Sequence, residues 1–125
     1  MKNSQAKSIL TTMYGKRCLL TGYKMPKDKL TYHHIVKREW GGTSTPENGA
    51  NLMQEIHNWL HCSIEQNNKE LFLLINECLM LYKKVLDKNN IDLIRQFEEE
   101  CQPLFREECR KCGSQKMYRK TKGRN

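Results

Sequence analysis

The four histidines of this 125-residue chain lie at positions 33, 34, 57 and 61, in two close pairs. His57 and His61 are one helical turn apart, so on a helix both imidazoles project from one face and can bind one ion. Adjacent residues of a strand face opposite sides, so only one of His33 and His34 can point at that ion. The other is free to accept a proton from water, because imidazole titrates near neutrality.

Three protein ligands leave at least one coordination position open on such an ion, which is typical of catalytic sites and not of closed structural ones. The open position would accept a phosphate oxygen. A single His-x-x-x-His pair is more often a surface pair or a satisfied core pair. The second pair, placed just before a glycine-rich loop, makes a metal site the favoured interpretation.

Four sequence segments must position these side chains. "LTYHHIV", residues 30–36, is rich in β-branched and aromatic residues and predicts a strand. Residues 37–50 carry three glycines and a proline and predict a loop. "NLMQEI", residues 51–56, predicts a short returning strand. From His57 onward the pattern predicts a helix with a buried stripe formed by Trp59, Leu60 and Ile64.

Further elements flank this unit. Residues 4–14 predict a short first helix, and residues 18–30 predict a strand entering a turn. After the breaker "EQNNKE", residues 65–70, apolar residues recur at three- and four-residue steps and predict a long helix. Another helical pattern covers residues 91–101 and is expected to end at Pro103. The buried face of the long helix is predicted to carry Leu71, Leu74, Ile75, Cys78, Leu81, Tyr82, Val85 and Leu86.

Lysine and arginine number 22 against 14 acidic residues, which gives a formal charge of +8 and favours polyanionic partners such as nucleic acid. Residues 110–125 contain seven basic residues and no acidic one, so we expect a flexible basic tail that contacts phosphates. No run approaches the roughly 20 apolar residues of a spanning helix. The N-terminal segment also lacks the apolar core of a secretory signal. We therefore expect a cytoplasmic protein with no membrane partner and, despite six cysteines, no obligatory disulfide.

The stretch "HHIVKREWGGTSTPENGANLMQEIHNWLH", residues 33–61, resembles the motif of the HNH endonuclease family, which includes homing endonucleases, bacterial DNase toxins, restriction enzymes and many phage proteins. The match rests on the His-His-Ile-Val strand, the Gly-Gly loop, an asparagine and the His-x-x-x-His helix, and covers about residues 18–64. It implies an α+β fold with a ββα-metal core (HNH, or His-Me finger) and additional N- and C-terminal helices. The expected organisation is a single nuclease domain at residues 1–109, with its core at about 18–68 and C-terminal helices at about 69–109, followed by the tail at 110–125.

The resemblance implies a metal-dependent endonuclease that hydrolyses DNA phosphodiester bonds. His33 would be the first metal ligand, His57 and His61 would complete the metal site, and His34 would be the general base. The cofactor would be one divalent ion: Mg, Mn, Ni, Co or Zn. Small free-standing proteins of this kind occur in phages and mobile elements. The partners implied are double-stranded DNA and a phage packaging or mobile-element protein, inside a bacterial host cell.

In this family an asparagine holds the loop in place and orients the base, as a residue that hydrogen-bonds to a site residue from outside the site does. Asn48 is the first choice for this role, because nine residues separate it from His57, a spacing typical of members with the His-x-x-x-His ending. Asn51, directly before Leu52, is the competing choice. Both asparagines remain candidates at the level of sequence.

Cysteines and basic residues supply further candidates. Cys18 opens "CLLTG", a segment that in many HNH domains holds a structural zinc through paired cysteines, but here the second cysteine is missing. Cys109 and Cys112 form the only Cys-x-x-Cys and are a second candidate zinc site. The basic residues expected to contact phosphates lie in the loop and the tail: Lys37, Arg38, Arg110, Lys111, Lys116, Arg119, Lys120, Lys122 and Arg124.

Two other functions remain open. The chain could be a catalytically silent DNA-binding or phage packaging-accessory module that keeps the ββα shape. It could also be a histidine-ligated metal protein unrelated to nucleic acid, but that function leaves the +8 charge and the basic tail without a role. The presence of His34 favours the enzyme, because a degenerate member would more often have lost the base.

Overall fold

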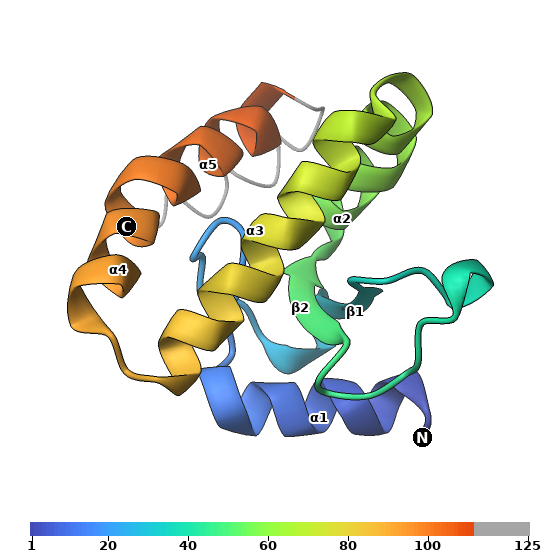
Figure 1. Ribbon diagram of the computed structural model, residues 1–125, viewed down its shortest axis with the longest axis horizontal. Coiled ribbons are helices and arrows are strands. Elements are labelled where there is room, and N and C mark those ends of the chain that lie inside the picture. Colours follow the sequence, from blue (N-terminus) through green and yellow to red (C-terminus); the bar gives the residue numbers. More distant parts are fainter. Residues whose placement is uncertain (112–125) are drawn as a thin grey trace.

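The computed structural model describes residues 1–111, in which helices surround a two-stranded antiparallel sheet (Figure 1). The elements are, in order, α1 (Asn3–Tyr14), η1 (Lys27–Lys29), β1 (Leu30–His34), η2 (Arg38–Trp40), β2 (Gly49–Met53), α2 (Gln54–Trp59), η3 (Leu60–Glu65), α3 (Lys69–Asp87), α4 (Ile91–Gln96), η4 (Phe97–Cys101) and α5 (Gln102–Lys111). The elements η3 and η4 are π-helical turns that continue α2 and α4. The fold class is therefore α+β, as predicted. None of the helices within residues 1–111 is long and apolar enough to cross a membrane.

The predicted order strand, loop, strand, helix is confirmed. β1 pairs with β2 in antiparallel register, with His33 opposite Ala50 and His34 opposite Gly49. The helix α2 begins directly after β2, earlier than the predicted start at His57. Because no turn separates β2 from α2, the first two turns of the helix stay close to the end of the sheet (Figure 1).

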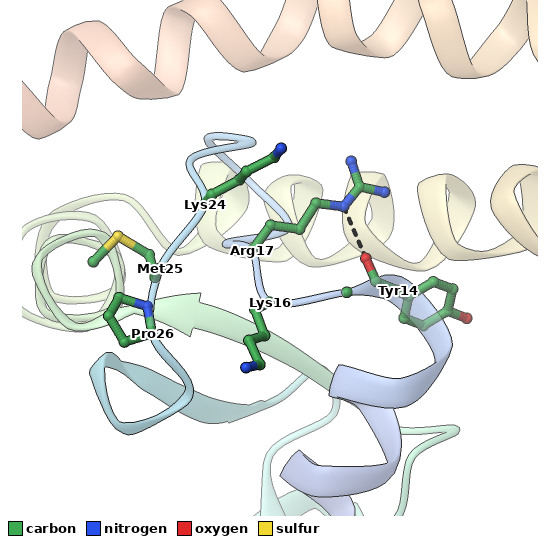
Figure 2. Close-up of a pocket in the computed structure, with 7 residues that line it drawn as sticks. Tyr14, Lys16, Arg17, Lys24, Met25 and Pro26 are labelled. Carbon is green, nitrogen blue, oxygen red and sulfur yellow. Dashed lines mark hydrogen bonds between the residues drawn. The ribbon is translucent and has the colours of Figure 1, made fainter. Parts of the chain in front are cut away.

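The strand predicted at the start of residues 18–30 is wrong. The chain instead forms a tight turn, in which the Gly22 N–H donates to Cys18 O at 2.8 Å, and a single isolated β-bridge joins Arg17 to Lys24. Gly22 has a φ of +80°, a conformation that favours glycine and reverses the chain before a strand can extend. The residues beside this bridge line an open pocket (Figure 2).

The long helix α3, which crosses the front of the molecule in Figure 1, buries or half-buries most of the predicted face but not all of it. Ile75 and Tyr82 are buried as predicted, but Leu74 and Leu81 are 54% and 60% exposed. The buried face is completed by the apolar Phe72 and Leu79 and by the polar Asn76 and Lys83. The helix is rotated relative to the prediction because polar side chains with partners in the fold occupy part of its buried face.

The last helix does not end at Pro103, as predicted, but continues to Lys111. A proline inside a regular helix clashes with the carbonyl four residues earlier. Here Pro103 is the second residue after the π-helical turn η4, whose wider spacing alters the carbonyls before it and accommodates the ring. Arg110 thus belongs to α5, and the predicted tail starts inside this helix. The remaining predicted tail contacts, Lys116, Arg119, Lys120, Lys122 and Arg124, lie outside the described residues.

Candidate metal centre

Three histidines converge at one point of the fold. His33 lies on β1, His57 on α2 and His61 on the π-helical turn η3. One ring nitrogen of each lies within 4.8 Å of the others, and the ring centroids are 4.9 to 5.3 Å apart. The three imidazoles are therefore close enough to bind one metal ion, as their spacing predicts.

A threonine on the neighbouring strand fixes the tautomer of His57. The ring Nδ1 lies 2.7 Å from Thr31 Oγ1, and the Thr31 hydroxyl donates its own hydrogen to Leu52 O at 2.8 Å. Since that hydrogen is already used, Thr31 Oγ1 accepts from Nδ1–H of His57. The lone pair of His57 is therefore on Nε2, where it can bind a cation.

The other two imidazoles have the same arrangement. His61 Nδ1 donates to Glu65 Oε1 at 2.8 Å, and His33 Nε2 donates to Asn76 Oδ1 at 2.7 Å. The lone pairs that remain are on Nε2 of His61 and on Nδ1 of His33. Nδ1 of His33 is fully buried and has no hydrogen-bond partner among residues 1–111. A buried polar atom without a partner is unusual, and a bound cation would satisfy it.

None of these three partners is identified by the sequence analysis. Glu65 could have been found, because it lies four residues after His61, the distance at which helical side chains meet. Thr31 precedes His33 by two residues and so shares its side of the strand. Asn76 interrupts an apolar run and needs a partner if buried, but nothing in its sequence neighbourhood indicates that the partner is a strand residue.

Burial keeps two rings of the cluster, His33 and His57, neutral. It lowers the pKa of His33 to about 3, opposed by the hydrogen bond to Asn76, and the neighbouring imidazoles lower it further. Burial also lowers the pKa of His57 to about 4, helped by the nearby His61. At neutral pH both rings therefore carry no charge, which is the protonation state that binds metal ions.

The metal-free protein should lose stability in mild acid. Both folded pKa values lie below the ordinary 6.5, so the unfolded chain takes up protons below about pH 6.5 that folded His33 and His57 do not. The free energy of unfolding should fall by up to about 1.4 kcal/mol per pH unit for each ring until the folded rings protonate. Urea unfolding in EDTA at pH 7, 6 and 5 measures this slope. The variant His57→Gln should have a shallower slope, and an equal slope in both proteins would contradict the assignment.

His34 lies beside the cluster but does not belong to it. Its Nε2 is 3.0 Å from Ser44 Oγ, and its ring meets the edge of the Tyr32 ring at 4.8 Å between centroids. Burial lowers the pKa of His34, and the positive charge of Arg38 lowers it further. The alternation of side chains along β1 thus separates His33 from His34, as predicted.

The two candidate asparagines have different partners. Asn48 braces the loop after β1: its Oδ1 accepts from Val36 N, and its Nδ2 donates to Val36 O and Thr43 O, all at 2.9 Å. Asn51 instead faces α1, where its Nδ2 donates to Lys7 O at 3.1 Å. The geometry therefore favours Asn48 for the role of bracing the loop.

The predicted phosphate contacts in the described part of the chain are mostly paired with carboxylates. Lys37 forms ion pairs with Glu39 and Glu65, so Glu65 links Lys37 to His61. Arg38 is exposed on η2. At the end of α5 the two basic residues pair within the helix, Arg110 with Glu107 and Lys111 with Glu108.

The candidate zinc site at Cys109 and Cys112 lies only partly within the described residues. Cys109 is buried in the main apolar core together with Cys18, and Cys112 lies outside the described residues. Within residues 1–111, the three histidines are the one group of three or more potential ligands close enough to hold a metal ion. No family model, curated protein or solved structure matches this chain, so a functional assignment rests on the geometry of this site.

Proposed function

We propose that this protein is an HNH endonuclease that hydrolyses DNA phosphodiester bonds at a ββα-metal site. The observation that carries the proposal is a fourth imidazole, His34, placed on the strand next to the cluster of three imidazoles, with a loop braced by Asn48 beside it. β1 supplies the base and the first ligand, α2 and η3 supply the other two ligands, and β2 stands between them, which gives the order strand, strand, helix. The charge of +8 supports double-stranded DNA as the substrate.

In the proposed mechanism, the lone pairs of His33, His57 and His61 would hold one divalent ion, which when bound supplies positive charge to a phosphate oxygen. Nε2 of His34 lies 3.0 Å from Ser44 Oγ, and in the proposed mechanism it donates its N–H to that hydroxyl, which would leave the lone pair on Nδ1. That nitrogen accepts the proton of the attacking water. The products expected from the family resemblance carry 5′-phosphate and 3′-hydroxyl ends.

The loop after β1 serves the proposed base. Ser44, which fixes the ring of His34, lies next to Thr43, and the Thr43 carbonyl accepts from the Asn48 side chain. Burial and the positive charge of Arg38 lower the pKa of His34 and so keep its ring uncharged at neutral pH. Since Arg38 is also exposed, we assign it to substrate phosphates, whereas Lys37 is already paired with two carboxylates.

The donor set narrows the choice of ion without fixing it. Three imidazole nitrogens suit zinc, nickel, cobalt or manganese, whereas magnesium prefers oxygen ligands. HNH enzymes nevertheless work with several of these ions, magnesium included. The test of function is therefore run with a panel of ions.

Purified protein is incubated with supercoiled plasmid in Mg²⁺, Mn²⁺, Ni²⁺, Co²⁺ or Zn²⁺, and the open-circular and linear products are followed on gels. We expect cleavage with at least one ion and none in EDTA. Absence of cleavage with every ion, by protein that binds both metal and DNA, would contradict the enzyme and support the silent DNA-binding or packaging-accessory module. Absence of DNA binding as well would support a metal protein unrelated to nucleic acid.

A further inference from the structure

Lys83 is a lysine buried on the core-facing side of α3, with 4% of its surface exposed. Its ammonium donates to three backbone carbonyls, at 2.6 Å to Pro46 O, 3.0 Å to Glu47 O and 2.6 Å to Gly49 O. Three acceptors match the three protons of a lysine ammonium. The side chain therefore fastens the backbone on both sides of residue 48 to α3.

Asn48 lies in the middle of the fastened segment. Its carbonyl accepts from Ile35 N at 2.8 Å, and its side chain binds both the N–H and the C=O of Val36 at 2.9 Å. Ile35 and Val36 directly follow His34. A continuous chain of hydrogen bonds thus runs from Lys83 through the segment around Asn48 to the backbone beside His34.

We propose that Lys83 is a positioning residue for the reaction at His34: by holding the segment around Asn48, it sets the backbone that follows the base. This inference rests on the proposed function. The same face of α3 presents Asn76, seven residues earlier, whose side chain accepts from His33. A helix that follows the strand, strand, helix unit in the sequence therefore holds both a metal ligand and the loop next to the base.

Stability alone does not account for a lysine at this position. A buried charge carries a desolvation cost, which the hydrogen bonds of the ammonium offset. The ammonium also makes the conformation of the loop segment specific, because three donors directed at three carbonyls allow one arrangement of that segment. Removal of the donors should therefore release this loop segment, because three carbonyls would then lack a donor.

The test compares Lys83→Met with Lys84→Met, each in the full-length, metal-loaded protein. Lys83→Met keeps the length of the side chain and removes all three donors, and Lys84→Met makes the same change at the neighbouring exposed position. In Lys83→Met, amide hydrogen exchange at Ile35 and Val36 should accelerate by at least about ten-fold, because both amides bind Asn48. Amides of α1 should exchange as in wild type, and Lys84→Met should match wild type throughout.

The second readout is catalytic. Single-turnover DNA cleavage by Lys83→Met should fall about 100-fold, the cost of a misplacement on the order of 1 Å. The DNA affinity and the visible absorption of the Co²⁺-loaded site should stay unchanged, since His33, His57 and His61 keep their partners. In an Asn48→Ala background, Lys83→Met should cause no further loss, because both changes act through one segment.

Unchanged exchange and unchanged cleavage in Lys83→Met would overturn the proposal. A changed Co²⁺ spectrum would also overturn it, because the effect would then pass through the metal site. If wild type cleaves no DNA, the proposed function fails, and hydrogen exchange still decides whether Lys83 holds the loop. If Lys83→Met does not fold, Lys83→Gln, which keeps an amide donor, is measured by the same readouts.

Discussion

His34→Ala should lower the rate of metal-dependent plasmid cleavage by about two to four orders of magnitude, while metal and DNA affinity stay near those of wild type. The ring of His34 contacts Tyr32 and Ser44 and lies outside the three-imidazole cluster. Its removal takes away the proposed proton acceptor but leaves each of the three clustered histidines with its partner. The predicted result is a protein that binds substrate and ion and does not turn over.

Single-turnover time courses of supercoiled plasmid give the rate, and calorimetric titration with the activating ion gives the metal affinity. His34→Gln is the matched variant, because its side chain keeps hydrogen-bonding groups but cannot accept the proton at neutral pH. Both variants should be equally slow. Cleavage near the wild-type rate in either one would refute His34 as the base, and a parallel loss of metal affinity would assign His34 to the metal site instead.

The elements that carry the histidines could be predicted because their signals are local. A β-branched run predicts the strand of His33, and the spacing of His57 and His61 puts both rings on one helical face. The alternation of a strand then separates His33 from His34 without any knowledge of the tertiary structure. Each of these arguments needs only neighbouring residues, and the structure agrees with each of them.

The contacts that orient those histidines could not be predicted, because their partners are distant in the sequence. Apolar periodicity assigns polar residues of an amphipathic helix to the solvent side. Asn76 and Lys83 lie on the buried side of α3, where Asn76 Oδ1 accepts from His33 and Lys83 donates to the carbonyls around Asn48. The same effect exposes Leu74, which the apolar spacing had placed in the core.

Sequence rules for proline fail at Pro103 for a related reason. The rule that a proline ends a helix assumes regular α-helical spacing before it. The π-helical turn η4 removes that assumption, and a change of turn type has no reliable sequence signal. Local rules therefore predict which residues could form the site, whereas long-range packing decides how they are held.

His61→Ala should abolish most of the stabilisation that a bound metal ion gives the protein. His61 is 35% exposed, so alanine leaves little buried cavity, and Glu65 keeps Lys37 as a partner. Two imidazoles, His33 and His57, would remain for the ion. Loss of an outer partner already weakens metal binding by about 10- to 100-fold, so loss of a ligand should weaken it by at least about 100-fold.

Urea unfolding with and without metal converts this loss into a measurable difference. At a free metal concentration about 1,000 times the dissociation constant of wild type, binding stabilises the folded state by about 4.1 kcal/mol. A 100-fold weaker site at the same concentration contributes only about 1.4 kcal/mol. Cys62→Ala is the matched control, because it removes a neighbouring exposed thiol that could also bind metal, and it should keep the full difference. An undiminished metal effect in His61→Ala would mean that the ion binds elsewhere, and the assignment of the cluster as the metal site would fail.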